Sequence, residues 1–184
     1  MLHHSGSQVL YTPRLVLRPY RSGDEQMAYA NWLSDPIVAS FLSWNAHASV
    51  DVSKQLIDMW VEAYESPTVY HWGIEREGEL IGDIAVSRWN EDRESCEIGY
   101  CLSRRFWNQG LMTEALSAVM DYLFDTVGFH RISLRHDIRN IASGRVMQKC
   151  GMRPEGITRG ERKRADGSWA DICNYGLLSE DRKS

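Results

Sequence analysis

Apolar residues recur along the chain with two spacings, and these spacings predict strands that alternate with helices. Short apolar or alternating runs predict strands at residues 15–18, 70–75, 80–88, 95–103 and 131–136, and two more that flank the turn dipeptide Asp166-Gly167. Helical spacing predicts helices at residues 24–33, 50–64, 110–127 and 143–150. This order predicts an α/β (mixed α+β) fold, in which helices cover a mixed sheet that is mostly antiparallel in its first half.

Residues at the ends of these segments favour the same boundaries. Ser49 precedes the second helix as a candidate N-cap, and Pro36 is expected to stop the first helix. Gly110 precedes the clearest helix and Gly128 follows it. One face of that helix carries an apolar stripe formed by Met112, Ala115, Val119, Leu123 and Val127.

Length and charge narrow the classes of protein further. The chain has 184 residues, of which 43% are hydrophobic and 25% charged, as in globular proteins. We expect a single domain over residues 1–184, with residues 1–10 as a flexible N-terminal arm. The 21 basic and 25 acidic side chains leave a net charge of −4. This charge balance lacks the excess of basic residues typical of proteins that bind nucleic acid or an anionic membrane, so neither is an expected partner.

The N-terminal segment and the cysteines indicate a cytoplasmic protein. Residues 1–7 lack the charged and apolar regions of a signal peptide, and no apolar run approaches the roughly 20 residues that cross a bilayer. The four cysteines show neither CxxC pairing nor metal-ligand spacing with histidine. They are Cys96, Cys101, Cys150 and Cys173. We therefore expect reduced thiols and no metal centre.

A strand, a polar loop and a helix follow one another at residues 96–115. The N-terminus of a helix has unpaired N–H groups and a partial positive charge, so this loop suits a pyrophosphate. Gly110 would let the backbone approach such a ligand closely. The alternative is a tight connection without a ligand, which is the commoner role of one glycine before a helix.

A second strand leads into the short helix at residues 143–150. Asn140 and Ser143 precede this helix or lie at its start, so both are candidate capping residues. On these residues alone, capping is the simpler interpretation.

Together the two stretches resemble the GNAT (Gcn5-related N-acetyltransferase) superfamily, and specifically its RimJ/RimL-like branch. The resemblance covers nearly the whole chain, and its specificity lies in the order and spacing of several modest motifs. These are TPRLVLRP (12–19), IGDI (81–84), EIGY (97–100), WNQGLMTEA (107–115), Asn140, Ser143, and Asp171 with YGLL (175–178). The resemblance implies a central mixed, mostly antiparallel sheet of about seven strands flanked by about four helices.

The chain departs from the family pattern at two places. The glycine-rich loop of the family begins with Gln or Arg and ends with Gly or Ala, where this chain has Trp107 and Met112. The contacts that this loop implies are largely backbone N–H groups, so the assignment of the ligand survives. Many members carry a tyrosine seven residues after the asparagine that protonates the departing thiolate. This chain has Met147 there, which cannot donate a proton.

The resemblance implies acetyl-CoA as acyl donor and direct transfer to an amine in a ternary complex. Residues expected to bind this co-substrate are Cys101, Leu102, Asn108, Gln109, Gly110, Leu111, Met112, Thr113, Asn140, Ser143 and Lys149. A bulge of the family's strand would free backbone N–H groups around Cys101 and Leu102, which would polarise the acetyl carbonyl. Lys149 would reach the adenosine phosphates, or would only face a helix C-terminus.

Two side chains are candidates for the acid–base chemistry. Glu97 is the candidate general base, with a solvated strand residue as the alternative. Ser143 is the candidate that assists the thiolate, although a water could do the same. Trp44 and Tyr100 are the residues expected to contact the acceptor. For Tyr100, a position in the hydrophobic core is an equally good alternative. Strict alternation places Glu97 and Tyr100 on opposite faces of their strand.

Three questions stay open at the level of the sequence. The acceptor could be a protein N-terminal α-amine, a polyamine or another small amine. A non-catalytic acyl-CoA binding or sensing domain is the alternative function. It stays open because Met147, at the position of the family tyrosine, cannot donate a proton. A homodimer built through the hairpin near Asp166-Gly167 is one option for the assembly.

Overall fold

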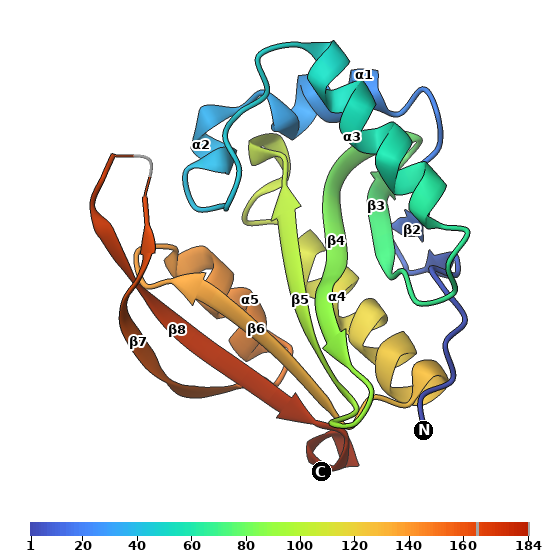
Figure 1. Ribbon diagram of the computed structural model, residues 1–184, viewed down its shortest axis with the longest axis vertical. Helices are drawn as coiled ribbons and strands as arrows, with labels where there is room; N and C mark the ends of the chain where they lie inside the picture. The colour runs from blue at the N-terminus through green and yellow to red at the C-terminus, as the bar shows by residue number, and fades with distance from the viewer. Residues whose placement is uncertain (165, 184) are drawn as a thin grey trace.

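One mixed sheet organises the computed structural model, which describes residues 1–164 and 166–183. Its eight strands lie in the order β1-β2-β3-β4-β5-β6-β8-β7 (Figure 1). They are β1 (Leu10–Tyr11), β2 (Val16–Arg18), β3 (His71–Arg76), β4 (Glu79–Asn90), β5 (Ser95–Leu102), β6 (Arg131–Asp137), β7 (Arg153–Lys163) and β8 (Trp169–Leu178). Among these pairs β5 and β6 are parallel, and the others are antiparallel. The predicted mixed, mostly antiparallel sheet is confirmed, and the additional strand is the two-residue β1.

The helices occupy the predicted regions, with one addition at Pro36. They are α1 (Glu25–Ala28), α2 (Pro36–Ala39), α3 (Val50–Ala63), α4 (Leu111–Tyr122) and α5 (Ile141–Lys149), and π-helical turns extend α1 over Tyr29–Leu33 and α4 over Leu123–Val127. Pro36 starts a helix instead of only following one, because the Asp35 carboxylate accepts a hydrogen bond from the Ile37 N–H at 2.9 Å. Ser49 lies at the N-cap position of α3, but its side chain makes no capping hydrogen bond.

The helices form two layers around the sheet. In Figure 1, α4 and α5 lie behind the strands, while α1 and α3 lie in front of one end of the sheet. The predicted apolar stripe of α4 is buried in the larger core, whose members include Met112, Ala115, Val119, Leu123 and Val127. A smaller core joins α1 and α3 to the sheet through Trp32, Ile57 and Leu80. None of the helices in the described residues is long and apolar enough to span a membrane.

The first ten residues pack against the domain, where the sequence favoured a flexible arm. Leu2 is buried in the larger core, with 6% of its surface exposed. The His3 N–H donates a hydrogen bond to the Val127 carbonyl at 2.8 Å. The Met1 amino group pairs with Glu94 at 2.5 Å. An apolar side chain and two polar contacts thus fix a segment whose sequence shows no periodic pattern.

Strands β5 and β6 separate partway along their length. Only the first three residues of β5 pair with β6, whereas β5 stays paired with β4 as far as Leu102. Figure 1 shows the two strands meeting at one end and diverging toward the other. The expected bulge is not in β5: the register shift places the extra residue, Ser87, on β4. Side chains of β5 therefore alternate without interruption.

Candidate functional site

A cavity of about 580 Å³ lies where β5 and β6 diverge. It is bounded by the end of β5, the loop before α4, α5, and the segment from α2 to Leu42. It brings together most of the predicted co-substrate residues, namely Cys101, Leu102, Asn108, Gly110, Leu111, Met112, Thr113, Asn140, Ser143 and Lys149. Gln109 is not part of the lining: its amide oxygen accepts a hydrogen bond from Arg76 at 3.0 Å.

Backbone N–H groups of β5 face the gap. The Ser103 N–H donates to the Ile81 carbonyl on the β4 side at 2.8 Å. Because the directions of N–H groups alternate along a strand, the Cys101 N–H also faces β4, whereas those of Tyr100 and Leu102 face the gap. The Leu102 carbonyl, on the gap side, accepts a hydrogen bond from the Trp107 indole at 2.7 Å. A carbonyl oxygen placed in the gap would thus meet amide donors of β5.

Two helix N-termini open into the same cavity. Gly110, the N-cap of α4, has φ of 75°, and the Asn108 φ of 60° is also left-handed. This turn aims the first N–H groups of α4, at residues 111–113, out of the helix. At the other helix, the Asn140 side chain accepts a hydrogen bond from the Ser143 N–H at 3.2 Å, which confirms its capping role. The partial positive charges of both helices point into one cavity.

Three cationic side chains and an apolar wall complete the lining. Arg139 and Arg145 join the predicted Lys149 around α5, and sequence reasoning missed both arginines. The spacing in the sequence could have indicated Arg145, because residues 145 and 149 are one helical turn apart on the same face of α5. The apolar wall is formed by Val38, Phe41 and Leu42, and no local pattern in the sequence connects this segment with α5.

The Tyr100 hydroxyl contacts Ser143 across the cavity. It lies 3.0 Å from the Ser143 hydroxyl and 3.1 Å from the Ser143 carbonyl. Burial raises the pKa of Tyr100, so its hydroxyl stays protonated. Tyr100 packs against the larger core, on the face of β5 opposite Glu97. Met147, at the position of the family tyrosine, is 1% exposed within that core.

Glu97 and Trp44 lie outside the cavity lining. The Glu97 carboxylate pairs with Arg88 at 2.5 Å and with Arg135 at 3.2 Å. Its face of β5 also carries Gly99, where an added Cβ would meet nothing within 4 Å. Trp44 packs against the smaller core beside His47. The front of β5 is therefore open above Gly99, with a carboxylate at one end of the opening.

No group of three or more His, Cys, Asp or Glu side chains suited to a metal ion occurs within residues 1–164 and 166–183. The chemistry of the cavity is that of amides, hydroxyls and cations. Such a lining suits an extended anionic ligand with a reactive carbonyl.

Comparisons with known proteins agree with this arrangement. A family model described as an acetyltransferase (GNAT) domain matches residues 14–153. An N-acetyltransferase of Bacillus subtilis (strain 168), YoaA, is 30% identical over 153 residues, which cover 82% of this chain and 86% of that protein. The [ribosomal protein uS5]-alanine N-acetyltransferase of Escherichia coli (strain K12) is 30% identical over 125 residues, which cover 65% of this chain and 63% of that protein.

Solved structures show the same fold. RimL, a ribosomal L7/L12 alpha-N-protein acetyltransferase in complex with coenzyme A, superposes with a TM-score of 0.84 at 18% identity, over 93% of this chain and 98% of that one. The self-immunity acetyltransferase MccE, in complex with acetyl-CoA and AMP, gives a TM-score of 0.81 at 17% identity, over 91% of this chain and 93% of that one. With the family model covering most of its length, the chain belongs to the GNAT family of N-acetyltransferases.

Proposed function

We propose that the protein transfers the acetyl group of acetyl-CoA to a primary amine by direct attack in a ternary complex. The observation that carries this proposal is the divergence of β5 from β6. It opens one cavity onto two β5 amides, two helix N-termini and three cations. The complexes of RimL with coenzyme A and of MccE with acetyl-CoA support the same class of ligand. An acetyl-CoA-dependent reaction is also consistent with the cytoplasmic location that the sequence predicts.

The lining residues divide into two groups by their chemistry. The N–H groups of residues 111–113, with Arg145 and Lys149, would bind the phosphates. Asn140 would bind the pantetheine arm, and the Leu102 N–H would polarise the thioester carbonyl. Acetyl-CoA supplies the acetyl group as a thioester, whose carbon is the electrophile.

The proton transfers fall to Glu97 and Ser143 in this proposal. The amine nitrogen forms a bond to the carbonyl carbon and gives a proton to Glu97, directly or through a water. The carbon–sulfur bond then breaks, and the thiolate takes a proton from water or from the Ser143 hydroxyl, which regains one from solvent. The Glu97 carboxylate that would accept this proton also pairs with Arg88 and Arg135.

The acceptor is a primary amine, either a protein N-terminal α-amine or a small amine. The E. coli relative that acts on the uS5 alanine favours the first class. A homodimer built through the hairpin of β7 and β8 stays a prediction; Trp169 on this hairpin is 63% exposed.

Calorimetric titration with acetyl-CoA, followed by thiol-release assays on amines and N-terminal peptides, tests the proposal. We expect binding, and turnover on one acceptor class. The variant Glu97→Gln should keep the affinity for acetyl-CoA and lose turnover about 10²-fold or more. Binding without turnover on any acceptor would favour the alternative function, a non-catalytic acyl-CoA sensor. Absence of binding would contradict both functions.

A further inference from the structure

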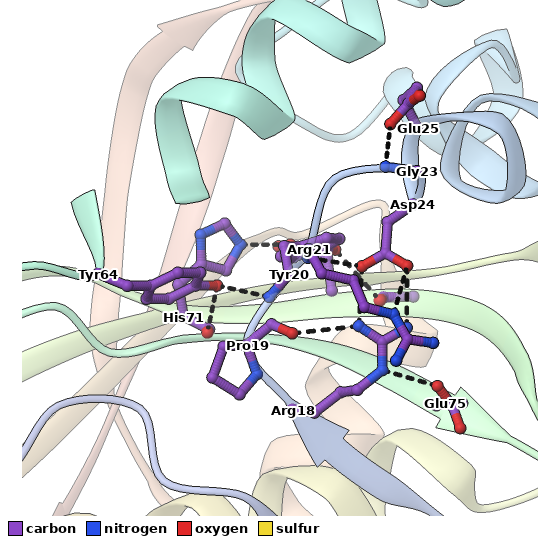
Figure 2. A network of polar contacts seen from close by, with 12 residues as sticks. Arg18, Pro19, Tyr20, Arg21, Gly23, Asp24, Glu25, Tyr64, His71 and Glu75 are labelled. Carbon is purple, nitrogen blue, oxygen red and sulfur yellow. Dashed lines mark hydrogen bonds and ion pairs between the residues drawn. The ribbon is translucent and has the colours of Figure 1, made fainter. Parts of the chain in front are cut away.

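A buried polar cluster lies on the front of the sheet, next to the open strip above Gly99. It joins Asp83 on β4 to His71 on β3 and to Tyr20 in the segment after β2. Figure 2 shows His71 and Tyr20 side by side. The His71 Nε2 lies 2.5 Å from the Asp83 Oδ2, and the Tyr20 hydroxyl donates to the same oxygen at 2.8 Å. Trp60 of α3 packs on both rings, with centroid distances of 4.8 Å to Tyr20 and 4.2 Å to His71.

One oxygen of the Asp83 carboxylate accepts no hydrogen bond from the described residues. Both side-chain contacts of Asp83 fall on Oδ2, and among the described residues no hydrogen bond reaches Oδ1. Oδ1 is not one of the fully buried unpaired atoms of the described chain, so it retains access to solvent. Asp83 as a whole is half-buried. The cluster therefore holds the carboxylate in one orientation and offers a single oxygen to a ligand.

The position of Asp83 connects this oxygen with the cavity. Asp83 is the cross-strand partner of Cys101, which lines the cavity. Directly opposed side chains on one face of a sheet have Cβ atoms about 4.5–5.5 Å apart. The two amides that face the gap, those of Tyr100 and Leu102, flank Cys101 in the sequence. An amine that approaches the cavity over Gly99 would therefore pass within reach of Asp83.

Three of the four titratable groups around Asp83 carry no charge. The titratable groups that face it are Tyr20, Tyr64, His71 and Cys101. Burial raises the pKa of both tyrosines and of the Cys101 thiol, so these three groups stay neutral.

We infer that Asp83 binds the ammonium group of the acceptor, and that Tyr20 and His71 act as positioning residues that orient its carboxylate. This inference rests on the proposed function and names one of its specificity determinants. It differs from the role proposed for Glu97, because both oxygens of Glu97 already pair with arginines. The acceptor class is then an amine that arrives as a cation, loses one proton to solvent next to the cavity, and gives the second to Glu97 as it attacks.

The test compares Asp83→Asn with the wild type, using the acceptor that gives the fastest turnover in the amine panel. We expect KM for this acceptor to rise about 10- to 100-fold, as for loss of a charged hydrogen bond, with kcat and the Kd for acetyl-CoA little changed. The difference in acceptor KM between Asp83→Asn and the wild type should shrink as the pH approaches the pKa of the amine. It should also be small for a weakly basic hydrazine that is already neutral at pH 7.5. Asp58→Asn on α3, which removes the same charge from an exposed pair with Lys54, is the matched control.

The possible results distinguish a failure of the role of Asp83 from a failure of the proposed function. An unchanged acceptor KM in Asp83→Asn, with an active wild type, would overturn this inference alone. A wild type that turns over none of the amines would overturn the proposed function and this inference with it. Should Asp83→Asn fail to fold, Tyr20→Phe decides, because it removes one hydrogen bond to the carboxylate and keeps the charge. A smaller rise in KM is expected there, and an unchanged KM would overturn the inference.

Discussion

The hydroxyl groups of Tyr100 on β5 and Ser143 on α5 lie 3.0 Å apart, across the cavity that opens between β5 and β6. Burial keeps the Tyr100 hydroxyl protonated, so it can donate to Ser143. Tyr100 also donates to the Ser143 carbonyl at 3.1 Å, and in the proposed reaction the Ser143 hydroxyl would supply the proton of the leaving thiolate. In this chain, a tyrosine from the sheet thereby orients the serine that stands near the position of the family tyrosine.

Replacement of Ser143 by alanine tests this role. We expect kcat to fall about 10²-fold, the lower range of general acid catalysis, while the Kd for acetyl-CoA changes little. Tyr100→Phe keeps the serine and removes only its partner, so a smaller fall in kcat is expected. Single-turnover kinetics would measure both. An unchanged rate in Ser143→Ala would mean that water protonates the thiolate.

A methyl group at Gly110 should weaken the binding of acetyl-CoA. With φ of 75°, alanine there costs about 1–2 kcal/mol in the left-handed region and would displace the first turn of α4. We expect the Kd to rise about tenfold. Gly128→Ala is the matched control, since its φ of 90° imposes similar strain at the far end of the same helix. Calorimetry should show lost stability for both variants and lost affinity only for Gly110→Ala.

Lys149 should contribute through the phosphates of the co-substrate. We expect Lys149→Gln to raise KM for acetyl-CoA several-fold, with an effect that falls as salt is added. The same variant should react normally with S-acetylpantetheine, which lacks the nucleotide. Lys54→Gln on α3, outside the cavity lining, controls for the loss of a positive charge. Equal losses on both acetyl donors would assign Lys149 a structural role.

His47 should make stability depend on pH. Its ring is half-buried, Nδ1 lies 2.8 Å from the hydroxyl of the fully buried Ser53, and burial lowers the pKa of His47 below 6.5. The unfolded chain therefore binds more protons than the folded one below about pH 6.5, so this contribution to stability is lost as pH falls. In urea titrations between pH 7.5 and 5.5, His47→Asn should lose less stability on acidification than the wild type. Parallel curves for the two proteins would exclude the contribution.

Local sequence was enough to predict most elements and the loop before α4. The apolar stripe of α4, the glycine at position 110 and the Asn140 cap each depend on neighbours within a few residues, which is why their patterns are readable. The helix that begins at Pro36 was missed, because the cap that starts it is a single aspartate, Asp35. The packed N-terminal segment was missed as well, since its partners Val127 and Glu94 are far away in sequence.

Tertiary structure alone decided the composition of the site. The divergence of β5 from β6 after three paired residues determines which amides of β5 are free. The meeting of Asp83 with His71 depends on the register of β3 and β4, which a shift near Ile74 alters. A shift of one residue would turn either side chain to the other face of the sheet. The sequence by itself determined the donor groups and the family of the chain. The packing of distant segments decided which carboxylates lie on the front of β4 and β5 beside Gly99, because strand register is fixed by long-range pairing and not by local preference.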